Sequence, residues 1–371
     1  MRKNILFKLF VAVCIFITGF ATNTKSQDFS QVLRGGVKDA SSILDGYIGP
    51  LGTAVGAGMN SGWYNTAKAH SMLGFDLTLS ASLIMAPSDA KNFTYNNGTS
   101  VKLIDGTTSA TSPTIFGSKT NDIQVGISNP AYNSATMPTS AKYLTTFNLP
   151  QGMGVALMAV PNLQLRVGIF KSTDIIVRYV PKETVDKFSI GLWGVGFLHD
   201  VKQWIPVVNL LPFDLSVQAG YSKLDLGYNF PNPTLPTAVV NGKPIYYSGT
   251  PNIPSNSTYA NQGMSYSVSA WNVNAIISKK LLFFTPYLGV GYQSSTANLA
   301  INGKYPLVVS MDPSTQATYI QDVDGPSSTV TASGAKATIG FQLKFFVITL
   351  HADYTMAKYS VATAGLGFTF R

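Results

Sequence analysis

The chain has 371 residues and a formal net charge of +9, with 45% hydrophobic and only 12% charged residues. Ordinary soluble domains carry roughly 25% charged residues. The sequence contains no dense run of Lys and Arg, so it gives no indication of nucleic-acid binding. Beyond residue 26, no stretch approaches the roughly 20 apolar residues of a membrane-spanning helix. Short alternating segments carry the hydropathy instead, which favours a membrane β-barrel over a large soluble β-sandwich or barrel.

Residues 1–26 are predicted to be a secretory signal peptide. A positively charged start precedes an apolar run over residues 9–20, and cleavage is expected between residues 21 and 27. Cys14, the single cysteine, lies in the apolar run, so the mature chain is expected to have no thiol chemistry. Cleavage leaves 22 basic residues against 17 acidic ones, a formal charge of +5.

Residues 27–71 are predicted to form an N-terminal helical or plug segment. Apolar residues recur at helical spacing from Val32 to Leu51. Pro50 and six glycines between residues 46 and 62 are expected to end the helix in a turn region. The glycines are interpreted as sites of close backbone packing rather than as a phosphate loop. The segment would lie in the periplasm or in the barrel mouth.

Residues 72–371 are predicted to form an all-β fold, a transmembrane antiparallel β-barrel. The clearest strand covers residues 72–86, where large apolar residues alternate with small or polar ones. The last forty residues contain three more strands of this kind, and nothing follows to cover their apolar faces except lipid. The predicted count is ten strands, rising to twelve or fourteen if residues 87–161 contribute further hairpins. An even number is expected throughout.

The lengths of the connections predict which end of the barrel faces outward. If the C-terminus is periplasmic, the turns near residues 171–173, 203–212, 280–283 and 346 are also periplasmic, and all are short. The long polar connections at residues 87–161, 230–263 and 303–331 then lie outside the cell. Short inner turns and long outer loops are the rule for outer-membrane barrels.

Two groups of aromatic residues support a membrane location. Aromatic side chains cluster near strand ends, where they suit the headgroup level of a bilayer; a carbohydrate-stacking site is the alternative. The terminal residues Gly367, Phe368 and Phe370 resemble the C-terminal assembly signal of outer-membrane barrels, although Arg371 follows where that signal usually ends. This resemblance implies two partners, the barrel insertion machinery and outer-membrane lipid.

Catalytic and metal-binding patterns are weak, so no enzyme activity, metal or cofactor is expected. The three histidines are far apart in sequence, and their spacing suits no metal site. His351 and Asp353 share one strand face but have no evident serine partner. Charged residues of both signs are expected to line the lumen, as ion pairs around a plug or along a polar path: Asp76, Arg166, Arg178, Asp214, Lys344 and Asp353.

One segment carries a family resemblance. Residues 60–70, NSGWYNTAKAH, lead into Gly74-Phe75-Asp76 and resemble the signature of an uncharacterised family of outer-membrane proteins from Gram-negative bacteria. Its characteristic positions are Asn60, Gly62, Trp63, Tyr64, Asn65 and His70. More loosely, residues 161–168 and 178–181 resemble barrels of the long-chain fatty-acid transporter superfamily. That resemblance implies an N-terminal plug, hydrophobic cargo and sideways release into the membrane.

Two functions follow as hypotheses for a protein of the cell outer membrane. The first is passive transport of a hydrophobic or small solute across that membrane, gated by the N-terminal segment. The alternative is a surface structural or interaction protein, in which the barrel is sealed and the external loops form the functional surface.

Overall fold

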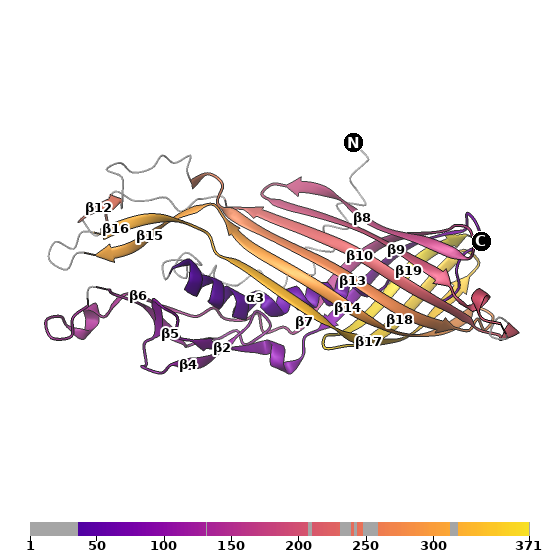
Figure 1. Ribbon diagram of the computed structural model, residues 1–371, viewed down its shortest axis with the longest axis horizontal. Coiled ribbons are helices and arrows are strands. Elements are labelled where there is room, and N and C mark those ends of the chain that lie inside the picture. The colour runs from indigo at the N-terminus through magenta and orange to yellow at the C-terminus, as the bar shows by residue number, and fades with distance from the viewer. Residues whose placement is uncertain are drawn as a thin grey trace.

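A closed antiparallel barrel of ten strands forms the body of the molecule (Figure 1). The computed structural model describes residues 36–130, 132–206, 210–230, 239–240, 243–247, 259–311 and 318–370, so the predicted signal peptide lies outside the described residues. In chain order the barrel strands are β1 (Phe75–Met85), β7 (Leu157–Gly168), β8 (Thr173–Val185), β9 (Phe188–Asp200), β10 (Asp214–Asn229), β13 (Gly263–Ser278), β14 (Phe284–Asn302), β17 (Ser327–Phe345), β18 (Ile348–Met356) and β19 (Ser360–Phe370). The prediction of a ten-stranded transmembrane β-barrel is confirmed.

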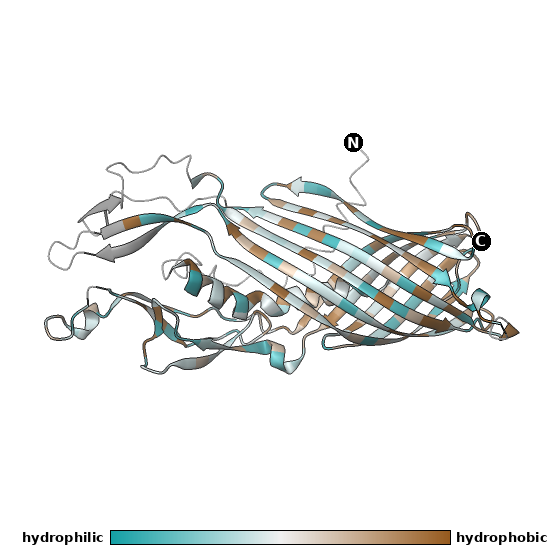
Figure 2. Ribbon diagram, viewed as in Figure 1, coloured by the Kyte–Doolittle hydropathy of each residue, from teal (hydrophilic) through white to brown (hydrophobic). Residues whose placement is uncertain are grey.

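Period-two alternation gives each strand an apolar outer face and a small or polar inner face. On β1, Leu79 is 53% exposed while its neighbour Ser80 is 5% exposed. Leu79 pairs with Leu366 of β19 on one side and Leu163 of β7 on the other, which closes the barrel. The outward apolar residues of all ten strands form a band around the barrel, called the outer belt here. It appears as brown patches in Figure 2.

Aromatic pairs mark both edges of the outer belt. Toward one end, Phe283 and Phe345 stack with ring centroids 5.6 Å apart. Toward the other, Trp271 and Tyr292 lie 6.0 Å apart. Amphipathic rings at both borders of an apolar band are typical of barrels that span a bilayer.

The barrel has a turn end and a loop end. At the turn end, where β19 finishes, the connections between strands are short: residues 169–172, 201–213, 279–283 and 346–347. Residues 86–156, 230–262 and 303–326 connect strands at the loop end and include the long connections predicted from the sequence. Two further connections there, residues 186–187 and 357–359, are short.

Residues 87–156 contribute no barrel strands, so the possibility of twelve or fourteen strands is wrong. They form instead two small sheets at the loop end, called the loop-end domain here (Figure 1). One pairs β2 (Asn92–Asn96) with β4 (Ser109–Pro113), and the other joins β3 (Val101–Leu103), β5 (Gln124–Ser128) and β6 (Tyr143–Asn148). Residues 87–156 are rich in Ser, Thr, Asn and Gly, so their strands lack the continuous apolar outer face that contact with lipid requires.

The remaining loop-end strands form a separate four-stranded sheet. Its strands are β11 (Val239–Val240), β12 (Lys243–Tyr247), β15 (Lys304–Met311) and β16 (Thr318–Asp324). Three short 3-10 helices complete the described elements: η2 (Ser88–Lys91) and η3 (Thr139–Ala141) in the loop-end domain and η4 (Lys202–Trp204) at the turn end.

Within the described residues one α-helix, α3 (Val37–Met59), runs from the loop-end domain into the loop-end half of the barrel (Figure 1). The prediction that Pro50 and the glycines end this helix is wrong, because α3 continues through Pro50, Gly52, Gly56 and Gly58. Packing against the barrel overrides the low helix propensity of these residues. No helix within the described residues is both long and apolar enough to cross a membrane.

Candidate functional site: the occupied lumen

Helix α3 lies so close to the inner wall that only glycine fits at several of its positions. A Cβ atom at Gly56 would lie 2.1 Å from Oγ of Ser295 on β14. At Gly58 it would lie 2.7 Å from Cγ2 of Val160 on β7. The glycines are therefore packing sites, and the sequence interpretation agrees with the geometry on this point.

After α3 the chain crosses the lumen as residues 60–71, called the lumenal segment here. It has no regular secondary structure and reaches the turn end at Leu73, whose N–H bonds the carbonyl of Gly168, 2.9 Å away. Trp63, Tyr64 and Asn65 are all buried within it. The family-like motif therefore lies inside the barrel.

Arg178 of β8 holds the start of the lumenal segment. Its side chain is 1% exposed, and its guanidinium donates to the carbonyl oxygens of Met59 and Ser61, both at 2.8 Å. The guanidinium carbon lies 3.9 Å from the ring centroid of Trp63, a cation–π contact. Gln164 Oε1 accepts from Arg178 Nε at 3.0 Å and fixes the orientation of the guanidinium.

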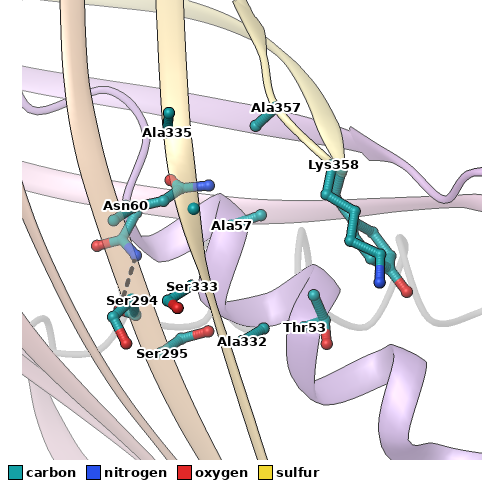
Figure 3. A pocket seen from close by; sticks show the side chains of 13 residues that line it. Thr53, Ala57, Asn60, Ser294, Ser295, Ala332, Ser333, Ala335, Ala357 and Lys358 are labelled. Carbon is teal, nitrogen blue, oxygen red and sulfur yellow. Dashed lines mark hydrogen bonds between the residues drawn. The ribbon is translucent and has the colours of Figure 1, made fainter.

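Lys336 and Asn272 hold Asn60, the first residue of the segment. Lys336 Nζ donates to the Asn60 carbonyl at 2.7 Å, and Asn272 Nδ2 donates to its side-chain oxygen at 3.1 Å. Asn60 Nδ2 in turn donates to the Ser294 carbonyl at 3.1 Å, the bond drawn in Figure 3. Three strands of the barrel thus meet at one residue.

A second buried cluster holds the end of the segment near the turn end. Arg166 of β7 donates to the Lys68 carbonyl at 2.6 Å and forms an ion pair with Asp174, which is 0% exposed. Asp174 also accepts the backbone N–H of His70 at 2.9 Å, and His70 Nδ1 lies 3.1 Å from its other oxygen. The buried carboxylate is thereby paired and hydrogen-bonded, as burial of a charge requires.

The commonest contact between the wall and this part of the chain is a wall side chain that donates to a backbone carbonyl of the lumenal segment or of Met59 just before it. An irregular segment cannot satisfy its own carbonyls, and buried carbonyls without partners are costly. The acceptors are Met59, Asn60, Ser61, Trp63, Ala67 and Lys68, and the donors are Arg178, Lys336, Gln164, Ser216 and Arg166. The arrangement keeps the lumen filled.

The predicted lumen-lining residues divide into two groups. Arg166, Arg178, Asp76 and Asp353 are buried inside the barrel, where Tyr287 Oη donates to Asp353 Oδ2 at 3.0 Å. Asp214 and Lys344 instead are half-buried in the part of the barrel nearest the turn end. Among the described residues, no group of three or more His, Cys, Asp or Glu side chains could hold a metal ion.

Sequence reasoning missed Asp174, Lys336 and Asn272 as residues of this site. Each has the inward parity of its strand, two residues from an inward neighbour such as Ile176 or Thr338. Strand parity could have placed them on the inner face. It could not have predicted what they bind, because the lumenal segment comes from another part of the chain.

The terminal motif has two different surroundings. Phe368 and Phe370 lie on the outer belt, 45% and 47% exposed. Gly367 faces inward, where a Cβ would lie 2.4 Å from Oγ1 of Thr349. A larger residue there would push into β18.

A small cavity of about 40 Å³ remains beside Asn60 (Figure 3). Residues 332–335 of β17, residues 357–359 and the end of α3 line it. Here the strand on one side of β17 extends further toward the loop end than the strand on the other side. β17 pairs with β14 from Ser327 onward but with β18 only from Ala337 onward.

These features define a ten-stranded β-barrel whose lumen is occupied by its own N-terminal segment. The chain belongs to a family whose model is described as "Family of unknown function (DUF6588)" and matches residues 1–370. No curated protein matches the chain.

Among solved structures, the chain is similar to several barrel proteins at low scores. Ail, the attachment invasion locus protein of Yersinia pestis, is 9% identical with a TM-score of 0.24, over 81% of this chain and 100% of Ail. The outer membrane protease OmpT of Escherichia coli is 9% identical with a TM-score of 0.30, over 84% and 99%. The translocator domain of the autotransporter NalP of Neisseria meningitidis is 8% identical with a TM-score of 0.27, over 81% and 90%.

Proposed function

We propose that this protein is an outer-membrane β-barrel that is closed at rest and presents its loop-end domain as an interaction surface. The observation that carries the proposal is the lumenal segment, whose backbone carbonyls accept hydrogen bonds from buried Arg178, Arg166 and Lys336. Displacing the segment would break these hydrogen bonds to charged groups, each of which contributes about 1.5–3 kcal/mol.

The packing of the loop-end domain supports the role as an interaction surface. Its side chains pack on the first half of α3 in one cluster that includes Ile43, Tyr95 and Phe147. Asp39 of α3 accepts the backbone N–H groups of Thr99, Ser100 and Val101 at 2.7–2.9 Å. Burial raises the pKa of nearby Tyr95 to about 12, so its hydroxyl stays protonated and donates to the Val101 carbonyl. A pre-organised surface binds partners at a lower entropic cost than mobile loops.

Location and partners follow from the same features as proposals. The outer belt with its aromatic borders fits outer-membrane lipid, and residues 367–370 fit the barrel insertion machinery. By the rule of short inner turns, the loop end faces outside the cell and the turn end faces the periplasm. The protein has no enzyme activity in this proposal.

Passive transport of a small or hydrophobic solute is the second candidate, and two observations favour it. The lumenal segment lacks regular structure, so it could move without breaking a strand ladder. Residues of β17 before Ala337 have no partner on β18, and the cavity next to Asn60 adjoins them. An opening could begin at this place. In this case the lumenal segment is the gate.

An engineered disulfide separates the two functions. Thr66 Oγ1 and Ser278 Oγ lie 3.2 Å apart, so Thr66→Cys with Ser278→Cys should tie the lumenal segment to β13. The matched control pair is Ser82→Cys with Thr363→Cys, whose hydroxyls also lie 3.2 Å apart but belong to adjacent wall strands. The mature chain contributes no competing cysteine, because Cys14 lies in the predicted signal peptide.

The measurement is flux of a small sugar and of a labelled long-chain fatty acid into vesicles containing the purified protein. A closed barrel gives no flux above empty vesicles for any of the proteins, oxidised or reduced. Flux by the native protein that is lost only in the oxidised Thr66→Cys/Ser278→Cys variant, and restored by reduction, would replace the first proposal with the second.

A further inference from the structure

The turn end exposes large apolar side chains at the tips of its connections. Phe346 is 97% exposed, and Leu210 and Leu282 are each 86% exposed. Together with Leu73, Phe170 and Trp204 they form a set called the turn-end rim here. Brown segments at the end of the barrel near the C-terminus show part of it (Figure 2). Water is an unfavourable surrounding for such a dense apolar set.

Three residues of the rim also occupy backbone conformations that favour glycine. Leu73, Leu282 and Phe346 have φ angles of 62°, 55° and 54°. Glycine or asparagine would adopt this left-handed region at lower cost and without apolar exposure. The backbone cost of bulky apolar residues at these positions is offset where their side chains leave water. A membrane interface is an environment of that kind.

The charges exposed among the rim residues are mainly positive. Lys171, Lys279 and Lys280 are exposed on the turns, and Lys68 is exposed near the end of the lumenal segment. The nearby carboxylates of Asp76 and Asp174 are 3% and 0% exposed and lie inside the barrel. Within the part of this end that the structure describes, Asp200 and Asp214 are the half-buried acidic residues.

We propose that the turn-end rim binds the headgroups of anionic phospholipids in the adjoining membrane leaflet. The proposal rests on the membrane placement given under the proposed function. The rim continues the outer belt past the stacked pair Phe283–Phe345. Its apolar side chains enter the boundary between headgroups and acyl chains, and the lysine ammonium groups bind lipid phosphates.

Nitroxide-labelled lipids provide the test. A Phe346→Cys variant carries a fluorophore and is placed in vesicles that contain both phosphatidylcholine and phosphatidylglycerol. The nitroxide is placed on one lipid or the other at equal total concentration. We expect phosphatidylglycerol to be favoured near this site by roughly fivefold or more, and added salt to reduce the preference.

Three controls make each outcome decisive. Lys171→Gln, Lys279→Gln and Lys280→Gln together should reduce the preference to about one, while Lys119→Gln, Lys142→Gln and Lys182→Gln at the loop end should leave it unchanged. A fluorophore at Val290→Cys, a site that is 62% exposed on the outer belt, should be quenched equally by both lipids.

Absence of quenching at residue 346 would mean that the rim meets water or a protein, and equal quenching by both lipids would remove the anionic preference. Either result overturns the inference. If Val290→Cys is not quenched, the membrane placement itself fails, and that failure is distinct from failure of the rim.

Discussion

The two halves of the lumen hold the same N-terminal segment by different interactions. In the loop-end half, α3 satisfies its own backbone hydrogen bonds and meets the wall through glycine, alanine and apolar side chains such as Val55 and Met59. In the turn-end half, the lumenal segment has no internal ladder, and wall side chains donate to its carbonyls. The inner wall therefore carries hydrogen-bond donors where the backbone carbonyls of the enclosed segment are unpaired, and small or apolar side chains where the helix pairs its own.

Loss of Arg178 should have the largest effect. Arg178→Leu leaves the carbonyls of Met59 and Ser61 without donors and removes the contact with Trp63, so the free energy of unfolding should fall by about 2–5 kcal/mol. Urea unfolding of the folded barrel in micelles measures the change. Lys182→Ala, an exposed position on the same strand, should stay within about 0.5 kcal/mol of the native protein. A native-like midpoint for Arg178→Leu would mean that the segment is not held through its backbone.

A methyl group on the helix tests the other half of the lumen. Gly56→Ala places Cβ within 2.1 Å of Ser295 Oγ, and we expect a loss of about 1–3 kcal/mol despite the better helix propensity of alanine. Adding Ser295→Gly removes the clashing atoms and should recover most of that loss. Gly334→Ala is the matched control, since nothing lies within 4 Å of its Cβ position. Equal effects of the single and double variants would argue against close packing at this site.

The smallest effect is expected where the helix meets the loop-end domain. Asp39→Ala removes the acceptor for three backbone N–H groups, at a local cost of about 1–2 kcal/mol. Hydrogen exchange should accelerate at residues 99–101, while exchange in β17 and β18 should not change. Faster exchange throughout the barrel would show that the loop-end domain and the barrel unfold together.

Much of the barrel was predictable from the chain because the rules concerned are local. A period of two places alternate side chains on opposite faces of a strand. Strands can span lipid only as a closed barrel, in which every backbone N–H and C=O is hydrogen-bonded to a neighbouring strand. Leu79 and Ser80 therefore belong to opposite faces before any partner strand is known. An even number of strands and the short turns at one end follow from the same alternation and from the positions of its breaks, whereas the exact number of ten required the structure of residues 87–156.

The sequence by itself determined the faces of the strands, the even parity of their number and the end at which the short turns gather; the tertiary structure decided that the number is ten. Only the tertiary structure decided the course of α3 through Pro50 and the placement of residues 60–71 in the lumen. It also decided the roles of Asp174 and Lys336, whose partners His70 and Asn60 are 104 and 276 residues away in the chain. The physical reason is that alternation is a property of neighbouring residues, whereas satisfying a buried carbonyl depends on which distant side chain the closed barrel brings to it.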